Sequence, residues 1–187
     1  MGVDDVTAPR RHRCAKVGLR GSTEGSGHII NAVRTSHADF ELLIVDHGSR
    51  EPETQAHLDD ITRSDPRMRV LRDDRSFNYS ALNNTAVAQS HGEFVVPMNN
   101  HIEALIEGWL AEMIALAQRP RAGCIGAKLY SPDGRIRHAG VVIGMTGVAG
   151  HGHKLFPKIH GGYAGCVRLR QNHSALTGAC LLVRRTI

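Results

Sequence analysis

Apolar and polar residues alternate along the chain between short strand-like runs and longer helix-like segments. The clearest strand is Phe40–Asp46, a nearly continuous apolar run of the kind that is buried on both faces of a sheet. Two further strands are predicted at Met68–Leu71 and Glu93–Met98, and two helices at Tyr79–Gln89 and Ile106–Gln118. Pro97 should end its strand, because proline cannot donate a ladder hydrogen bond. This order predicts an α/β fold with a mostly parallel sheet flanked by helices, in which Phe40–Asp46 is central.

The pattern changes after the last of these helices. Gly123–Tyr130 is predicted to be a strand, and the turn residues Ser131–Gly134 return the chain into Ile136–Ile143 as an antiparallel hairpin. The segment Gly144–Gly165 is rich in Gly and His and has little apolar rhythm, which predicts a long surface loop. Ala179–Val183 is the last predicted strand.

Length and composition favour one globular domain. The chain has 187 residues, of which 41% are hydrophobic and 22% charged, and no apolar run reaches the roughly 20 residues of a membrane span. Residues 1–13 are polar and basic without an apolar stretch, so we expect a flexible lead-in there and a domain at 14–187. The sequence therefore predicts a soluble protein without a transmembrane segment.

Cysteines and net charge narrow the class further. The four cysteines are scattered without a Cys-x-x-Cys pair, which favours reduced, mostly buried thiols in the cytoplasm. The net charge of +5 is a mild excess that suits a ligand such as a nucleotide diphosphate and does not require nucleic acid, which we do not expect as a partner.

Polar residues follow two of the predicted strands. Asp46 ends one strand, and Asn99, Asn100 and His101 follow another. Because ligands of parallel sheets bind beyond the carboxyl ends of the strands, these side chains could contact a base, a ribose and a divalent ion. A helix cap or turn is the more common role for an Asp such as Asp46, and a tight turn also explains the asparagines, so position alone settles neither case.

Ordered motifs then suggest a family. Four stretches carry the first part of the similarity: Asp46-His47-Gly48-Ser49, Asn78–Asn84 (NYSALNN), Gly92–Val96 (GEFVV) and Asn99-Asn100-His101. Six more continue it: Trp109–Met113, Gly126–Tyr130, Pro132–Ile136, His138–Val142, Gly147–His151 and Thr177–Arg185. In this order, from Phe40 to the end, the chain resembles family 2 glycosyltransferases of the bacterial polysaccharide and rhamnosyl transferase type.

The resemblance implies a GT-A fold, and an inverting transfer of a sugar from a nucleotide-diphosphate donor to a hydroxyl of a saccharide or lipid-linked saccharide. By match, Asp46 contacts the nucleobase, Asn84 lies in the segment around the nucleotide, and Asn99 lies near the ribose. His101 matches the residue that holds a divalent cation, Mn²⁺ or Mg²⁺. His138, Thr177 and Gly178 are candidates for lining the sugar or acceptor pocket.

Two departures from the family pattern bear on activity. The metal motif ends in His101, where relatives more often have aspartate, so a surface histidine after a lost metal site is an alternative. The acidic segment that carries the catalytic base in relatives follows the Thr-Gly-Ala-Cys strand, and we expect it beyond Ile187. The chain thus corresponds to a partial domain that supplies donor binding.

Two other classes of function stay open. One is a non-catalytic homologue that binds a nucleotide-sugar or a partner protein. The other is a zinc-stabilised binding module, because His151 and His153, with His138, His160 or His173, could ligate zinc, although their spacing matches no strong zinc signature.

Overall fold

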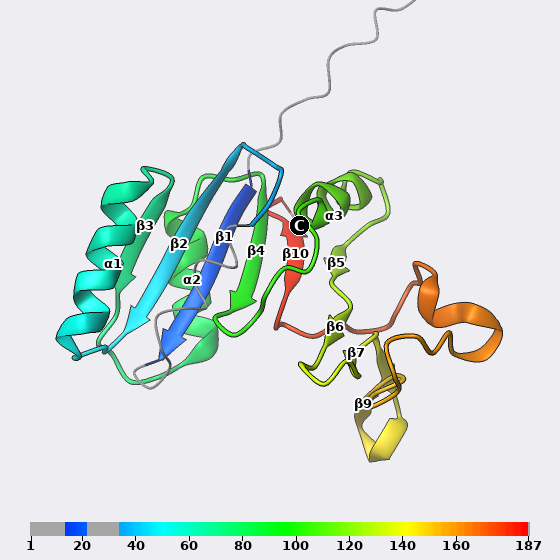
Figure 1. Cartoon of the computed structure of the whole chain (residues 1–187). Helices are drawn as coiled ribbons and strands as arrows, with labels where there is room; N and C mark the ends of the chain where they lie inside the picture. The colour runs from blue at the N-terminus through cyan, green and yellow to red at the C-terminus, as the bar shows by residue number, and fades with distance from the viewer. Residues whose placement is uncertain (1–13, 22–33, 187) are drawn as a thin grey trace, which may run out of the picture.

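The computed structural model describes residues 14–21 and 34–186; the predicted lead-in at 1–13 lies outside the described residues. Six strands form one sheet in the order β3-β2-β1-β4-β10-β5 (Figure 1). The strands are β1 (Cys14–Gly21), β2 (Phe40–His47), β3 (Met68–Arg72), β4 (Phe94–Asn99), β5 (Cys124–Gly126) and β10 (Leu181–Arg184). The first four strands pair in parallel and β10 pairs antiparallel with β4 and β5, which confirms the predicted mostly parallel sheet.

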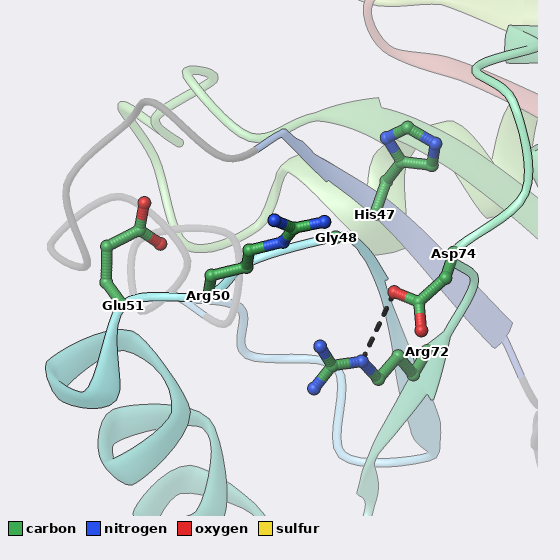
Figure 2. A pocket seen from close by; sticks show the side chains of 6 residues that line it. All are labelled: His47, Gly48, Arg50, Glu51, Arg72 and Asp74. Atoms are coloured by element: carbon green, nitrogen blue, oxygen red, sulfur yellow. Dashed lines mark hydrogen bonds and ion pairs between the residues drawn. The ribbon is translucent and has the colours of Figure 1, made fainter.

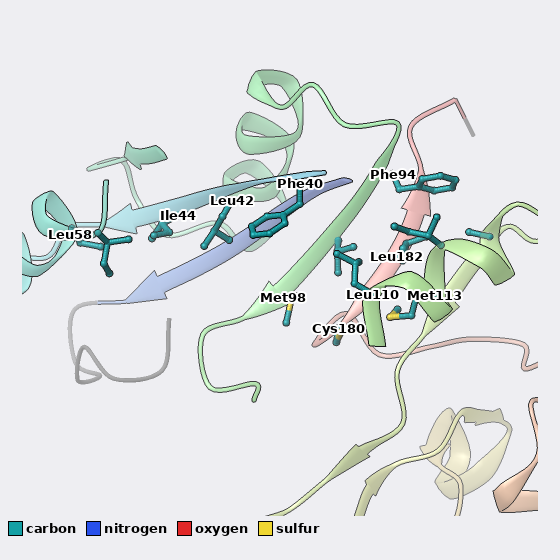
Figure 3. Close-up of a cluster of buried hydrophobic side chains, with 14 residues drawn as sticks. Phe40, Leu42, Ile44, Leu58, Phe94, Met98, Leu110, Met113, Cys180 and Leu182 are labelled. Atoms are coloured by element: carbon teal, nitrogen blue, oxygen red, sulfur yellow. The ribbon is translucent and has the colours of Figure 1, made fainter. Parts of the chain in front are cut away.

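Helices cover both faces of this sheet. On one face, Leu42 and Ile44 of β2 and Phe94 of β4 pack in one cluster with Leu58 and Leu110 (Figure 3). Leu58 belongs to α1 (Pro52–Ser64) and Leu110 to α3 (Trp109–Ala117). Each of these large apolar side chains stabilises the fold by about 1.5–3 kcal/mol when it is fully buried.

The helix α2 (Tyr79–Gln89) covers the opposite face. Its residues Leu82 and Ala86 form a second cluster with Val45 of β2 and Val95 of β4. Neighbouring residues of a strand point to opposite faces, so the continuous apolar run predicted for β2 serves both clusters at once. The strand is an interior one but not the central strand that the sequence predicted, since β1 and β4 lie in the middle of the sheet.

The helix predictions hold for α2 and need correction elsewhere. The predicted helix Ile106–Gln118 begins only at Trp109, because Gly108 is the N-cap and residues 106–108 form a turn. α1 was not predicted as an element, since only Leu58 and Ile61 are buried along its polar sequence. Among the described residues, no helix is long and apolar enough to cross a membrane.

Pro97 lies inside β4 and not at its end. The backbone nitrogens of every second residue in a strand point to the same side. Asn99 N–H donates to the Ala179 carbonyl at 3.0 Å, so the nitrogen of Pro97 also faces the segment that leads into β10. The ladder between β4 and β10 is interrupted at this level, between the pair Val95–Val183 and the isolated bridge Met98–Cys180. Proline is tolerated here because no hydrogen bond is lost.

A buried carboxylate, that of Glu41, anchors the amino end of β2. Glu41 is only 3% exposed, and its Oε1 accepts hydrogen bonds from the backbone N–H groups of His91 and Gly92, while its Oε2 pairs with Arg69 Nη2 at 3.0 Å. Burial by itself raises the pKa of Glu41, but these hydrogen bonds outweigh it and the pKa is lowered. Glu41 therefore ties β2 to the loop that enters β4.

Between β5 and β10 the polypeptide forms two small two-stranded sheets. The predicted hairpin is present as β6 (Leu129–Tyr130) and β7 (Ile136–His138), closed by the predicted turn, in which Gly134 N–H donates to the Ser131 carbonyl at 3.0 Å. The long predicted strands are wrong: Gly123–Tyr130 divides into β5 and β6, and Ile136–Ile143 divides into β7 and β8 (Val141–Ile143).

The segment predicted as a long loop is also partly ordered into elements. It contains η3 (Met145–Gly147), β9 (Ala149–His151) and the start of η4 (Tyr163–Arg168), and β9 pairs antiparallel with β8. Glycine-rich sequence concealed this pairing, because short strands carry little apolar rhythm. We call residues 129–170 the hairpin module.

A pair of histidines lies at the centre of the hairpin module. The His138 ring is 2% exposed, its Nε2 accepts from Gly140 N–H at 3.3 Å, and its Nδ1 lies 2.9 Å from Nδ1 of His151. Because Nε2 is an acceptor, the proton of the neutral His138 ring is on Nδ1 and is donated to His151. Burial, with further contributions from His151 and His173, lowers the pKa of His138 to about 4.

The cysteines differ from the expected mostly buried set. Of the three whose side chains are described, Cys180 is buried, Cys166 is half-buried and Cys124 is exposed. Cys124 lies on β5, the edge strand of the sheet, which explains its exposure.

Replacing Glu41 with Gln should destabilise the fold by about 1–3 kcal/mol near neutral pH, because a buried acceptor of charge-assisted hydrogen bonds is neutralised. The measurement is urea unfolding, with the exposed Glu107→Gln variant as control. The lowered pKa of Glu41 stabilises the folded chain at pH values above 4.5, the usual pKa of this carboxyl. The difference in unfolding free energy between wild type and Glu41→Gln should therefore shrink below that pH. A Glu41→Gln protein as stable as the control would contradict this role.

The His138 pair predicts a pH dependence of stability. The ring has a pKa of about 4 in the folded chain and 6.5 as its usual value, so the unfolded chain takes up the proton first as the pH falls. Stability should decrease by up to about 3 kcal/mol between pH 6.5 and pH 4. In His138→Gln this decrease in stability should be smaller, whereas the exposed control His160→Gln should show it in full. If stability decreases by the same amount between pH 6.5 and pH 4 in wild type and both variants, the assignment is refuted.

Candidate functional site

The carboxyl ends of β2, β3 and β4 meet at one edge of the sheet. Asp46 and Asn99 flank the end of β1, because Arg20 is in register with Asp46 and Leu19 with Asn99. Strands two places apart in a sheet are about 10 Å apart, so both residues lie at the same edge with β1 between them. Alternation along the strands directs Asp46 to the face of Leu42 and Ile44, and Asn99 to the face of Val95. The structure thus places the base and ribose candidates, which are 53 positions apart in the sequence, at one edge of the sheet but on opposite faces.

Asp46 is buried and incompletely satisfied. It is 2% exposed, and its Oδ1 has no hydrogen-bond partner among the described residues. Its backbone carbonyl accepts from Asp73 N–H at 2.9 Å, which extends the β2–β3 pairing past the strand ends. Ser49, fully buried in the same loop, also has an Oγ without a partner. Buried polar atoms of this kind are costly and are usually completed by a ligand or water.

A pocket opens beside this loop, between the ends of β2 and β3 (Figure 2). Its volume is about 760 Å³, and its lining is polar: His47, Gly48, Arg50, Glu51, Arg72 and Asp74. Arg72 is already engaged, with Nε 3.3 Å from Asp74 Oδ1 and Nη2 donating to the Ser49 carbonyl. Arg50 also lines the pocket, and its side chain extends across it in Figure 2. A guanidinium is a group that pairs well with anionic ligands.

The loop after β3 is held by a second carboxylate. Asp73 is 8% exposed and forms a two-pronged ion pair with Arg75, whose hydrogen bonds lower the pKa of Asp73 to about 2. Arg75 in turn donates to Thr85 Oγ1 of α2 and offers its carbonyl to His47 Nε2 at 2.7 Å. This network ties β2, β3 and α2 together behind the pocket, and sequence reasoning missed it because Asp73 and Arg75 follow no apolar pattern.

A second group of candidates gathers at the end of β4. Asn99 N–H donates to the Ala179 carbonyl, so the segment of Thr177 and Gly178 lies beside it. Thr177 Oγ1 accepts from Ala179 N–H at 3.3 Å, and Tyr79 of α2 donates its hydroxyl to the Gly178 carbonyl at 3.2 Å. A Cβ on Gly178 would approach that hydroxyl to 3.2 Å, so glycine permits this close contact. Tyr79 was not predicted as a site residue.

The other predicted residues, Asn84, His101 and His138, differ in their exposure. Asn84 is exposed on α2, whereas its neighbour Asn83 is buried and leaves its Oδ1 without a partner among the described residues. His101 is exposed two residues after Asn99. His138 is enclosed in the hairpin module, where both ring nitrogens are already engaged.

The histidines do not form a zinc cluster. Within residues 14–21 and 34–186, no three His, Cys, Asp or Glu side chains are grouped so that they could hold a metal ion. His153 contacts Cys166 at 3.9 Å, and His138 contacts His151, but these remain pairs. This arrangement does not support the zinc-stabilised module as an alternative.

Comparison with solved structures agrees with the fold. The structure of GalNAc-T7 with UDP, GalNAc and Mn²⁺ superimposes with a TM-score of 0.65 at 16% sequence identity, over 93% of this chain and 35% of that chain. The similarity confirms the expected GT-A type of α/β fold.

Comparison with known sequences gives the family. The chain is 60% identical over 154 residues to the uncharacterized protein y4gI of Sinorhizobium fredii, and 40% identical over 156 residues to the O-antigen biosynthesis protein RfbC of Myxococcus xanthus. Each match covers 82% of this chain but only 17% and 12% of the relatives, respectively. The model of glycosyl transferase family 2 matches residues 27–187. With an α/β sheet of GT-A type and a family match over most of its length, this chain belongs to glycosyl transferase family 2.

Proposed function

We propose that this chain binds a nucleotide-diphosphate sugar at the carboxyl edge of the sheet, as the donor part of an inverting glycosyltransferase. The buried Asp46 Oδ1 without a partner is the observation that carries the proposal. An ionised carboxylate only accepts hydrogen bonds, so this atom requires an N–H or O–H donor from a ligand. The pocket of about 760 Å³ in the adjoining loop is large enough for a nucleotide.

The chemistry of Asp46 favours some bases over others. Uracil and thymine carry an N3–H and guanine an N1–H, whereas neutral cytosine and adenine have a lone pair at the corresponding ring nitrogen. We propose that Asp46 Oδ1 faces this ring position, where a lone pair would leave two acceptors opposed in a buried place; the exocyclic amino groups of cytosine and adenine, which can also donate to a carboxylate, would have to shift to reach it. We therefore assign the donor to the uridine, thymidine or guanosine class.

The remaining candidates take roles along the same edge. Asn99 is proposed to contact the ribose, and Arg50 to neutralise part of the diphosphate charge. Thr177 and Gly178 line the sugar, held beside Asn99 by the hydrogen bonds of Ala179. Asn84, which is exposed on α2, contacts the nucleotide from the outside.

His138 is enclosed and hydrogen-bonded on both ring nitrogens. We therefore propose that its part in the acceptor pocket is to position His151, whose ring is exposed and keeps its Nε2–H for a ligand. The acceptor is proposed to be a saccharide or a lipid-linked saccharide.

A divalent cation fits this site only partly. His101 is exposed next to the end of β4 and offers one imidazole, and Asn99 and Asn100 offer neutral amide oxygens, a set better suited to Mn²⁺ than to Mg²⁺. His101 would hold the ion, which when bound supplies positive charge to the leaving diphosphate. We assign the general base to no residue described here.

Calorimetric titration tests the base assignment. UDP, dTDP or GDP should bind in the micromolar to millimolar range, and CDP and ADP about tenfold or more weakly. Asp46→Ala should weaken binding of the favoured nucleotide by about tenfold or more, because the donor on the base loses its partner. The exposed Asp60→Asn variant is the matched control. Equal affinity for all five nucleotides would sink the assignment, and nucleotide binding without sugar transfer by the full-length protein would favour a non-catalytic homologue.

The metal residue is tested in the same titrations with and without Mn²⁺. Wild type should bind the nucleotide about tenfold more tightly with Mn²⁺, and His101→Ala should lose that gain while it keeps the metal-free affinity. His101→Asp should restore the gain and extend it to Mg²⁺, since carboxylate oxygen suits that ion. His160→Ala, another exposed histidine, should behave as wild type. If the Mn²⁺ effect survives in His101→Ala, the ion is held elsewhere.

A further inference from the structure

Charge is distributed unevenly along this chain. From Gly134 to the end there are eight Lys and Arg residues and no Asp or Glu, so the preceding 133 residues hold 15 basic and all 18 acidic residues. The same part of the sequence collects apolar surface. Among the described residues, nine of the thirteen exposed large hydrophobic side chains lie between Val142 and Leu169. Cationic and apolar surface therefore coincide in the hairpin module.

The densest combination is the segment 154–160 (KLFPKIH), which we call the docking loop. Its side chains Leu155, Phe156 and Ile159 are 59%, 43% and 82% exposed. The loop is nevertheless fixed to β7, because Leu155 N–H donates to the Ile136 carbonyl at 2.8 Å and Ile136 N–H donates to the Phe156 carbonyl at 2.7 Å. Its apolar side chains are thus held outward by an ordered backbone.

Backbone strain at Leu155 supports a role for this exposure. The residue has φ of +71°, in the left-handed region that a bulky side chain rarely adopts. Strain of this kind persists where the surrounding structure enforces it and is often found at functional positions. Here it presents a leucine to solvent, which gains no burial in the chain itself.

Four cationic residues belong to the docking loop or hydrogen-bond to its backbone. Arg135 Nη1 donates to the Leu155 carbonyl at 3.0 Å, and Arg168 Nη2 donates to the Ile159 carbonyl at 2.8 Å. Lys154 and Lys158 belong to the loop itself and are exposed. Asp133, 3.5 Å from Arg135, is the one carboxylate that an ion pair places against this group within the described residues.

We propose that the docking loop, with Arg135 and Arg168, binds the surface of an anionic lipid bilayer. Apolar side chains with Lys and Arg nearby suit that surface, since the former enter the headgroup region and the latter meet the negative charge. Figure 1 shows this part of the chain, in orange, on the side of β6 and β7 away from the six-stranded sheet. A protruding loop can reach a flat surface while the nucleotide pocket stays open, so the inference is independent of donor binding.

Vesicle co-sedimentation tests the proposal. Two kinds of vesicle are compared at low salt: pure phosphatidylcholine, and phosphatidylcholine with roughly 30 mol% phosphatidylglycerol. The purified chain should bind the anionic vesicles at least about fivefold better, and added NaCl should reduce this difference. The double variant Leu155→Ser/Ile159→Ser should lose about fivefold or more on the anionic vesicles. Lys154→Gln/Lys158→Gln should lose binding and most of its salt dependence.

Matched controls lie outside the module. Leu105→Ser removes an equally exposed leucine (64%), and Arg121→Gln removes an exposed cation, so both should bind vesicles as wild type does. Circular dichroism should show that every variant is folded. Equal binding to neutral and anionic vesicles, or unchanged binding by the Leu155→Ser/Ile159→Ser protein, overturns the proposal. The proposal is also overturned if the wild-type chain does not bind vesicles but self-associates, and the double variant abolishes the self-association. The docking loop would then be a protein interface.

Discussion

β2 presents Leu42 and Ile44 to one face of the sheet and Leu43 and Val45 to the other, and each of these side chains is at most 2% exposed. A strand buried in this way needs helices on both faces, so α1 and α3 on one face and α2 on the other follow from its sequence. Burial on this scale stabilises the fold by several kcal/mol per strand. It also means that the strand can meet a ligand only at its end, where Asp46 lies.

The two buried carboxylates of β2 show how differently its ends are used. Glu41 at the amino end has partners for both oxygens and closes the loop between α2 and β4. Asp46 at the carboxyl end is as deeply buried and leaves Oδ1 without a partner among the described residues. A fold selected for stability alone would satisfy both or replace one, because an unpaired buried acceptor costs about 1–3 kcal/mol. This difference supports the proposal that a ligand binds at the carboxyl end.

The sequence allowed the parallel sheet to be predicted because long apolar runs such as Phe40–Asp46 have few alternatives. It did not reveal α1, whose buried face consists of Leu58 and Ile61, or the pairing of β8 with β9, which glycines conceal. Of the candidate site, the place of Asp46 and Asn99 at the carboxyl edge of the sheet was predictable from the strands that they end, whereas their roles came from the family resemblance and stay predictions. Tyr79 was not predictable, because its hydrogen bond to Gly178 joins residues 99 positions apart and depends on the tertiary fold.

The hairpin module has no large core, and its strained backbone must therefore be held by polar contacts. His153 and Leu155 follow β9 directly and have φ values of +57° and +71°. On one side, His151 at the end of β9 is fixed by the buried His138 ring; on the other, β7 holds the loop through two backbone hydrogen bonds. The His138 ring keeps both of its hydrogen bonds only while it is neutral, because a second proton on this ring would go to Nε2 and abolish the bond from Gly140 N–H. The lowered pKa of His138 keeps it neutral across the physiological range, so the exposed apolar loop keeps its conformation there.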